Sequence, residues 1–434
     1  MINNMDANEV LKTITDFYLN SGDFNGIIIT DLGEDFEKIR NTLRKLLESE
    51  KIVLNFGDRH PNPHILAFEA EPKDQQLRKL DNLKFEEPIY EEYGPLRIQV
   101  NSINCCAYPS KQHLRVLVEK DRYENRPYAL LLALGEPQLS YRTFNLRILE
   151  FYRNDPRYYY ETDDIQGNIS AKTERGLDKS DETFLQTFGF AYDEGIKNRY
   201  VAVYLRYLAD LTPEHQQRWK LEEFNGNTFL HPDYIRTTGG NWPEKESIFN
   251  AFCAEMRIIN EMTLKIFGER LFRKTYDRDN KPKKFGFLVR PTRDEYDDFV
   301  HLLDKMLSDN LNKEFFKGKV ELTKLEKRGE VFIEQNKGTI VLLQEWLDKI
   351  VKFPDPKPKD DMIKTLKEIR DERSKPAHHV QDDKWDNKYF AEQREIIMRA
   401  YQAIRTLRLI FSNHPLAKSV NVPDWLCKGE IWTF

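Results

Sequence analysis

The sequence predicts a multidomain α+β protein: a small mixed unit, a strand-containing middle region and a mainly α-helical C-terminal half. Two observations support this class. A length of 434 residues is enough for more than one hydrophobic core, and 40% hydrophobic with 32% charged residues is typical of a folded chain. Apolar residues recur at helical spacing through the second half, whereas short apolar runs bounded by turn residues fill the middle. We therefore expect four regions: 1–80, 86–180, 185–290 and 291–434.

Composition limits the possible functions. No apolar stretch approaches the roughly 18 residues of a membrane span, and "MINNMDANEVLKTITDF" lacks the pattern of a signal peptide, so we expect a cytoplasmic protein without membrane contact. The four cysteines show no C-x-x-C spacing, and no His, Asp or Glu pattern indicates a metal, so neither a metal nor a cofactor is expected. A net charge of −5 predicts no general affinity for nucleic acid, so such binding would need a local basic surface.

Residues 1–80 have the order helix, helix, two-stranded wing. "ANEVLKTITDFYL" and "FEKIRNTLRKLLESE" show helical spacing, while "KIVLNFG" and "HPNPHILAFEA" suggest two strands joined by a Pro-rich turn that includes His60 and His64. This order is typical of a winged-helix domain. The region holds 10 Lys+Arg against 14 Asp+Glu, which disfavours a DNA reader and favours protein docking or a scaffold role.

The region 86–180 is expected to be strand-rich, with strands at "LRIQV", "HLRVLVEK" and "YALLLAL". The following "YRTFNLRILEFYRNDPRYYY" mixes arginines with aromatic residues, which could hold single-stranded nucleic acid. Acidic residues follow at once, so a domain junction with paired arginines is the favoured interpretation. Residues 185–290 are expected to be a helical linking region, including "RYVAVYLRYLADL" and "IFNAFCAEMRIINEMTLKIFGERLF". The pair Gly239–Gly240 is expected to form a turn.

Residues 291–434 are expected to form a helical bundle. Its predicted helices are "VHLLDKMLSD", "GTIVLLQEWLDKIV", "DDMIKTLKEIRDER" and "KYFAEQREIIMRAYQAIRTLRLIF". The connection between the last two contains "IRDERSKPAHHV", in which Arg370 and Arg373 stand one helical turn apart and Pro376 precedes His378 and His379.

The order Arg373, Ser374, three further residues and His378 resembles the Arg-polar-x-x-x-His motif of HEPN domains, which are small helical bundles carrying this motif before the closing helix. The "LKEIR" helix ahead of it and the long amphipathic helix behind it are similar too. The resemblance covers about the last quarter of the chain, and Ser374 stands where the family often has asparagine. Arg370 and His379 are additional candidates outside the pattern.

This resemblance implies a metal-independent endoribonuclease. RNA carries its own nucleophile, the 2′-hydroxyl, so an enzyme needs a proton carrier near neutrality and a cation for the phosphorane. His378 would transfer the proton, Arg373 would bind the phosphoryl oxygens and Ser374 would orient one of them, giving a 2′,3′-cyclic phosphate. Lys375 and Arg394 are candidates for binding the RNA strand.

A purely structural interpretation stays open. Cations near a helix C-terminus are favoured by the helix dipole, each by about 0.3–1 kcal/mol, and His378 could cap free carbonyls. A catalytic bundle would bring Arg373 and His378 together on an open basic cleft. A structural one would bury them in hydrogen bonds to carbonyls or to acids such as Asp371 and Glu372.

Two functions therefore remain. The first is an RNA-cleaving effector, such as a bacterial antiviral-defence or toxin protein, whose other regions sense a phage trigger or a regulatory protein. The second is a non-catalytic regulator with a DNA- or protein-binding N-terminus and a dimerising bundle. The resemblance implies a homodimer with two motifs in one cleft, and the helix 386–411 has apolar residues around more of its circumference than one bundle needs: Tyr389, Ile396, Tyr401 and Ile410. Alternatively, this face packs against helices of the same chain.

Overall fold

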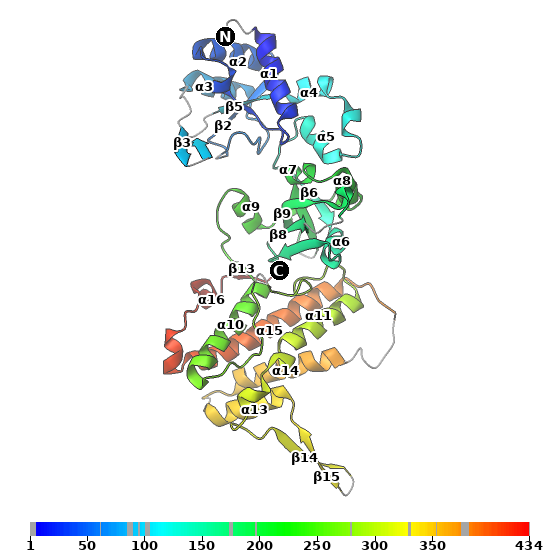
Figure 1. Cartoon of the computed structure of the whole chain (residues 1–434), viewed down its shortest axis with the longest axis vertical. Helices are drawn as coiled ribbons and strands as arrows, with labels where there is room; N and C mark the ends of the chain where they lie inside the picture. The colour runs from blue at the N-terminus through cyan, green and yellow to red at the C-terminus, as the bar shows by residue number, and fades with distance from the viewer. Residues whose placement is uncertain are drawn as a thin grey trace. The chain divides into compact units, whose positions relative to one another are not determined.

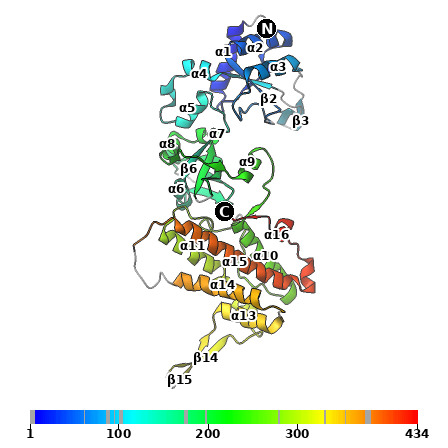
Figure 2. The same cartoon turned by 180° about the vertical axis from the view of Figure 1, so that it is seen from behind.

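The computed structural model describes residues 6–60, 62–84, 90–93, 96–99, 105–172, 177–195, 198–277, 280–328, 331–352, 354–374 and 382–433. It is a mixed α+β structure, as predicted (Figures 1 and 2). The chain divides into two compact units. The first contains residues 1–148, 155–159 and 168–230, and the second contains residues 149–154, 160–167 and 231–434.

The N-terminal part of the first unit is built around a three-stranded antiparallel sheet with the order β1-β5-β2. Its elements are α1 (Ala7–Asn20), β1 (Ile27–Ile28), η1 (Ile29–Leu32), α2 (Phe36–Glu48), β2 (Ile52–Phe56), α3 (Lys73–Asn82), β3 (Tyr90–Tyr93), β4 (Leu96–Gln99) and β5 (Cys105–Pro109). Asp6 and Glu9 form a capping box at the start of α1. The apolar faces of α1 and α2 pack with this sheet in one core.

The two predicted helices and the first predicted strand of this part are confirmed, but the second strand of the wing is wrong. Residues 62–70 contain no strand, and β2 pairs instead with β5, with Leu54 opposite Ala107. The Asn55 side chain donates to the carbonyls of Pro63 and Ile65, both at 2.9 Å, which holds this segment as a turn. Proline also lacks the N–H that a strand ladder requires.

Between residues 111 and 230 the chain forms a seven-stranded sheet with the order β11-β6-β10-β9-β8-β7 and with β12 beside β9. The elements are α4 (Lys111–Leu117), η2 (Lys120–Tyr123), α5 (Pro127–Ala133), β6 (Tyr141–Asn145), α6 (Ile148–Asn154), β7 (Tyr158–Thr162), β8 (Gln166–Ala171), η3 (Lys179–Asp181), β9 (Phe184–Tyr192), β10 (Arg199–Tyr204), α7 (Leu205–Ala209), α8 (Pro213–Leu221), β11 (Glu223–Phe224) and β12 (Phe229–Leu230).

Several predictions for this region are wrong. The stretches 113–120 and 128–134 were expected as strands, but α4 and α5 occupy most of them. Ser110 accepts a hydrogen bond from the His113 N–H at the start of α4, and Pro127 lies in the first turn of α5, so both helices have ordinary start signals. Conversely, residues 199–204 form β10 rather than the predicted helix, because the apolar run 201–204 is buried within the sheet.

The arginines of the stretch 141–160 are paired with acids, as predicted, but these acids are not the ones that directly follow the stretch in the sequence. The pairs are Arg142–Glu223, Arg147–Glu222, Arg153–Glu295, Arg157–Asp155 and Arg157–Asp181. The chain passes repeatedly from one unit to the other between residues 148 and 168. These pairs reduce the positive charge that the stretch could offer to a nucleic acid.

The second unit is mainly helical. Its elements after residue 231 are α9 (Pro232–Thr238), β13 (Glu246–Ser247), α10 (Ile248–Phe267), α11 (Arg293–Met306), η4 (Ser308–Asn310), α12 (Lys313–Phe316), β14 (Thr323–Arg328), β15 (Val331–Asn336), α13 (Thr339–Ile350), α14 (Lys357–Ser374), α15 (Lys388–Ser412), η6 (Pro415–Ser419), α16 (Asp424–Lys428) and β16 (Ile431–Trp432). Gly239 and Gly240 form the predicted turn. Within the described ranges, no helix is both long and apolar enough to cross a membrane.

The four helices predicted for the bundle are confirmed as α11, α13, α14 and α15, and α10 joins them in one hydrophobic core. In Figure 1, α15 lies against α10 and α14, and α11 lies beside α14. A buried ion pair between Arg408 on α15 and Glu255 on α10 lies inside this packing. The antiparallel hairpin β14–β15 was not predicted.

The apolar residues of α15 are used within the chain. Tyr389, Ile396 and Tyr401 are buried, and Ile410 packs against the same core. The prediction that this helix has a spare apolar face is therefore wrong, because α10 and α14 cover that face. The alternative, packing against helices of the same chain, is the arrangement observed.

Candidate functional site

The first half of the predicted motif lies at the C-terminal end of α14. Met362, Ile363, Leu366 and Ile369 turn one face of this helix into the core. Arg370 and Arg373 follow on the last turns, and Ser374 is the last residue of the helix. The Ser374 hydroxyl donates to the Arg370 carbonyl at 3.0 Å, so it bonds its own helix.

Two acids hold the Arg373 guanidinium. Its Nη1 atom donates to Asp304 Oδ2 at 2.5 Å and to Asp309 Oδ2 at 2.7 Å. Asp304 is fully buried on α11, whereas the Arg373 side chain remains 25% exposed. Within the described part of the chain, Nε and Nη2 of Arg373 donate no hydrogen bond. The acids thus fix one nitrogen and leave most of the donor fork open.

Asp309 links the two arginines of the motif region. Its other oxygen, Oδ1, accepts a hydrogen bond from Arg370 Nη2 at 2.9 Å. Burial alone would raise the pKa of Asp309, but hydrogen bonds from Arg373 and Arg370, together with their charges, outweigh burial and lower it. Asp309 is therefore an anion that stabilises both arginines in their present positions.

His301 is a titratable group near this cluster that the sequence interpretation missed. It lies on α11, one helical turn before Asp304. Burial lowers the pKa of His301, and the positive charges of Lys305 and Arg373 lower it further, against the opposing effects of Asp304 and Asp298. The spacing of His301 and Asp304 on one helix face was visible in the sequence, but nothing in the sequence placed that face beside Arg373.

The remaining predicted residues are placed as follows. Arg394 is half-buried on α15. The other three lie outside the described residues: Lys375, His378 and His379. The described half of the motif therefore meets acids, as the structural interpretation requires, but these are Asp304 and Asp309 rather than Asp371 and Glu372.

α11 holds the chain on both sides of residues 375–381. Before this segment, the Tyr296 hydroxyl donates to Glu372 Oε1 at 3.1 Å. After it, the Arg293 N–H donates to the Lys384 carbonyl at 2.9 Å. The helix that provides Asp304 thus also fixes both flanks of the motif.

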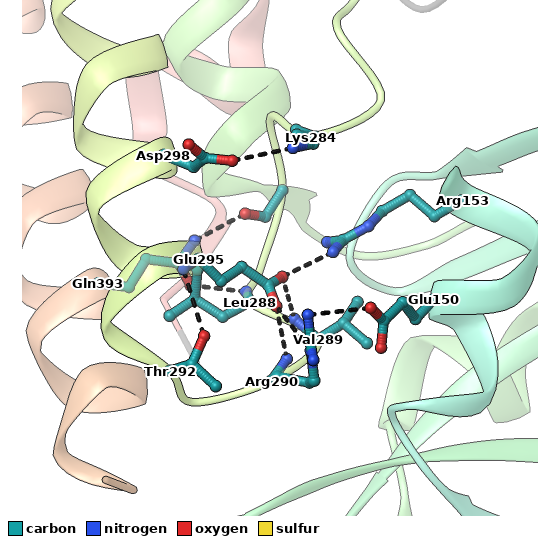
Figure 3. Close-up of polar contacts among 11 residues, drawn as sticks. Glu150, Arg153, Lys284, Leu288, Val289, Arg290, Thr292, Glu295, Asp298 and Gln393 are labelled. Atoms are coloured by element: carbon teal, nitrogen blue, oxygen red, sulfur yellow. Dashed lines mark hydrogen bonds and ion pairs between the residues drawn. The ribbon is translucent and has the colours of Figure 1, made fainter. Parts of the chain in front are cut away.

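A second polar cluster fixes the other end of α11 (Figure 3). Glu295 Oε1 accepts hydrogen bonds from Arg153 Nη2 and the Val289 N–H, both at 2.8 Å, and Oε2 accepts one from the Arg290 N–H at 2.9 Å. Thr292 caps the helix by accepting from the Glu295 N–H at 3.3 Å. Each charge in this cluster has a partner, so it anchors a loop and offers no free catalytic group.

One other pair of reactive side chains, His64 and Cys106, is unsuited to catalysis. His64 Nδ1 lies 2.7 Å from the Gly26 carbonyl and 3.6 Å from Cys106 Sγ. Burial raises the pKa of the Cys106 thiol well above its usual range, so it stays a neutral thiol and not a nucleophile. Among the described residues, no group of three or more His, Cys, Asp or Glu side chains could hold a metal ion.

No protein-family model matches the chain, and no curated protein or solved structure matches it either.

Proposed function

We propose that the C-terminal bundle is a metal-independent endoribonuclease of the HEPN type, which cleaves RNA to 2′,3′-cyclic phosphate ends as part of an antiviral-defence or toxin function. The supporting observation is the position of Arg373. It lies in the last turn of α14, the helix before the closing helix of a bundle, and its Nε and Nη2 donate to no described group. A guanidinium fixed by one nitrogen can receive a phosphoryl oxygen on its free side without reorganising.

In this proposal, Arg373 binds the charge that develops on the phosphorane and His378 transfers the proton. Arg370 shares Asp309 with Arg373 and so positions it. His301 would supply a second, neutral imidazole near the same guanidinium.

One observation favours a second candidate, a non-catalytic bundle that serves regulation or assembly. Asp304 and Asp309 bring two negative charges to Arg370 and Arg373, which leaves this cluster close to neutral. A neutral cluster attracts an RNA phosphate weakly. Arg373 would then be a structural clamp between α11 and α14.

RNA cleavage in EDTA distinguishes the two candidates. We would incubate the purified protein with tRNA and mixed cellular RNA and determine the fragment ends. The nuclease predicts cyclic phosphate ends, with cleavage reduced at least about 100-fold in His378→Ala, because the proton transfer needs an imidazole. His379→Ala, the matched neighbour, should retain most activity.

Arg373→Lys provides the complementary test. Lysine keeps the charge but not the planar fork, so the nuclease predicts a large loss of kcat. A structural clamp predicts lower stability in Arg373→Lys and no cleavage by any variant. Full cleavage by His378→Ala would exclude the catalytic assignment.

A further inference from the structure

A cavity of about 870 Å³ opens beside the candidate site in the second unit. It is lined by Arg273, by residues 309 and 311–314, by Gly338 and the first turn of α13, and by the C-terminal half of α14. Leu311, Ile340 and Val341 supply an apolar part of its wall. This volume lies within the roughly 300–1,000 Å³ typical of small-molecule sites.

Four basic side chains line the cavity. Arg370 donates to Asp309, and Lys367 donates to Gln344 at 2.9 Å. The other two, Arg273 and Lys313, make no side-chain hydrogen bond or ion pair with any described residue. Their charges are therefore available to a ligand.

The N-terminus of α13 adds positive potential at the same place. Gly338 precedes the helix, and within the described chain no side chain accepts from its first turn. The first-turn residues Thr339, Ile340 and Val341 line the cavity. The start of a 12-residue helix carries roughly half a positive charge, which favours an anion.

The acids of the cavity do not cancel this charge. Asp309 is already shared by Arg370 and by Arg373, which lies outside the lining. Glu314 lies 3.6 Å from Lys317, which is also outside it. Asp371 is the third acid. The cavity therefore has four cations and three carboxylates, and two of these carboxylates also pair with cations outside the cavity.

We propose that this cavity binds a small ligand that carries a phosphate group, separately from any RNA cleavage. Arg273 and Lys313 bind the phosphate together with the N–H groups of α13, and the apolar wall contacts the rest of the ligand. The phosphate comes either from a nucleotide or from inorganic phosphate, and neither source requires His378.

Isothermal titration calorimetry of the full chain tests this proposal. The probes are AMP, inorganic phosphate, adenosine and a single-stranded DNA decamer, which a 2′-hydroxyl-dependent nuclease cannot cleave. We expect a phosphate-bearing small probe to bind at least about tenfold more tightly than adenosine. The double variant Arg273→Ala/Lys313→Ala should weaken that binding at least about tenfold.

The matched control is Lys274→Ala/Lys324→Ala, which removes the same charge from exposed positions outside the cavity. It should bind as the unmodified chain does. If AMP binds more tightly than phosphate, the ligand is a nucleotide. If AMP and phosphate bind equally, the ligand is free phosphate. The proposal is overturned if neither probe binds, if the decamer alone binds, or if both double variants lose affinity equally. Because no arm measures cleavage, failure of the proposed nuclease leaves this test intact.

Discussion

Asp304 is a fully buried carboxylate whose Oδ2 accepts from Arg373, while Oδ1 has no partner among the described residues. Removing one member of a buried ion pair costs about 3–5 kcal/mol, and less here because Arg373 is partly exposed. We expect Asp304→Ala to lower the free energy of unfolding by about 1–3 kcal/mol in urea denaturation. The matched control on the same helix is Asp298→Ala, which breaks an exposed pair with Lys284 and should cost at most about 1 kcal/mol. Equal losses would show that Asp304 is no anchor.

His301 gives the candidate site a pH dependence with a definite sign. Its pKa is lowered, first by burial and then by Lys305 and Arg373, while Asp304 and Asp298 act in the opposite direction. The unfolded chain therefore binds a proton more readily than the folded one. The contribution of His301 is fully present above its unfolded pKa of about 6.5 and is lost as pH falls through the lower, folded pKa.

The measurement is the melting temperature between pH 5 and pH 8. His301→Gln should show a smaller drop toward pH 5 than the unmodified chain, because glutamine does not titrate. Asp309 does not contribute to this difference, because its lowered pKa keeps it ionised between pH 5 and pH 8. Identical pH profiles for the two proteins would contradict a stability role for His301.

At the scale of elements, α11 is the anchor of the candidate site, because Glu295 fixes its start and Asp304 lies near its end. Glu295→Ala would leave Arg153 and two loop N–H groups without their acceptor. We expect a loss of about 2–4 kcal/mol in unfolding free energy. Amide hydrogen exchange should become faster in residues 286–292, with little change in Asp298→Ala. Unchanged exchange in this loop would show that other contacts hold it.

The long helices were predictable from the sequence because repeated helical spacing and end signals agree over many residues. Thr292 caps α11, and α14 and α15 end within a few residues of their expected bounds. The predictions for short apolar runs failed in both directions: residues 128–134, expected as a strand, lie mostly in a helix, and residues 199–204, expected as a helix, form a strand. Such runs carry no distinguishing period, so burial within the fold decides their conformation.

The candidate site was predictable in part. The sequence placed Arg370, Arg373 and Ser374 at the end of a helix, which is where they lie. It could not show that Asp304 and Asp309 neutralise the arginines, because these residues come from a segment more than 60 positions earlier. The structural interpretation named Asp371 and Glu372 as possible acidic partners, but Arg373 pairs with neither of them. Glu372 instead accepts a hydrogen bond from Tyr296.

For the whole molecule, any affinity for RNA has to come from a restricted surface. The net charge is −5, and many arginines outside the bundle have acidic partners. A long polyanion is repelled by such a chain except where cations gather. RNA binding that required the first unit would be unexpected on these grounds.

The remaining prediction for the whole molecule is a homodimer, and the argument for it is the small number of catalytic groups in each chain. The apolar face of α15 cannot provide the interface, because α10 and α14 already cover it. One arginine and one histidine per chain still form a small site, so we propose that two copies share a cleft.

Mixing inactive Arg373→Ala with inactive His378→Ala should restore part of the activity, because a mixed dimer contains one intact copy of each residue. The control mixes His378→Ala with separately prepared His378→Ala, which should stay inactive. Sedimentation velocity at micromolar concentration should show a dimer. A monomer that cleaves RNA, or a dimer without restored activity, would exclude the shared cleft.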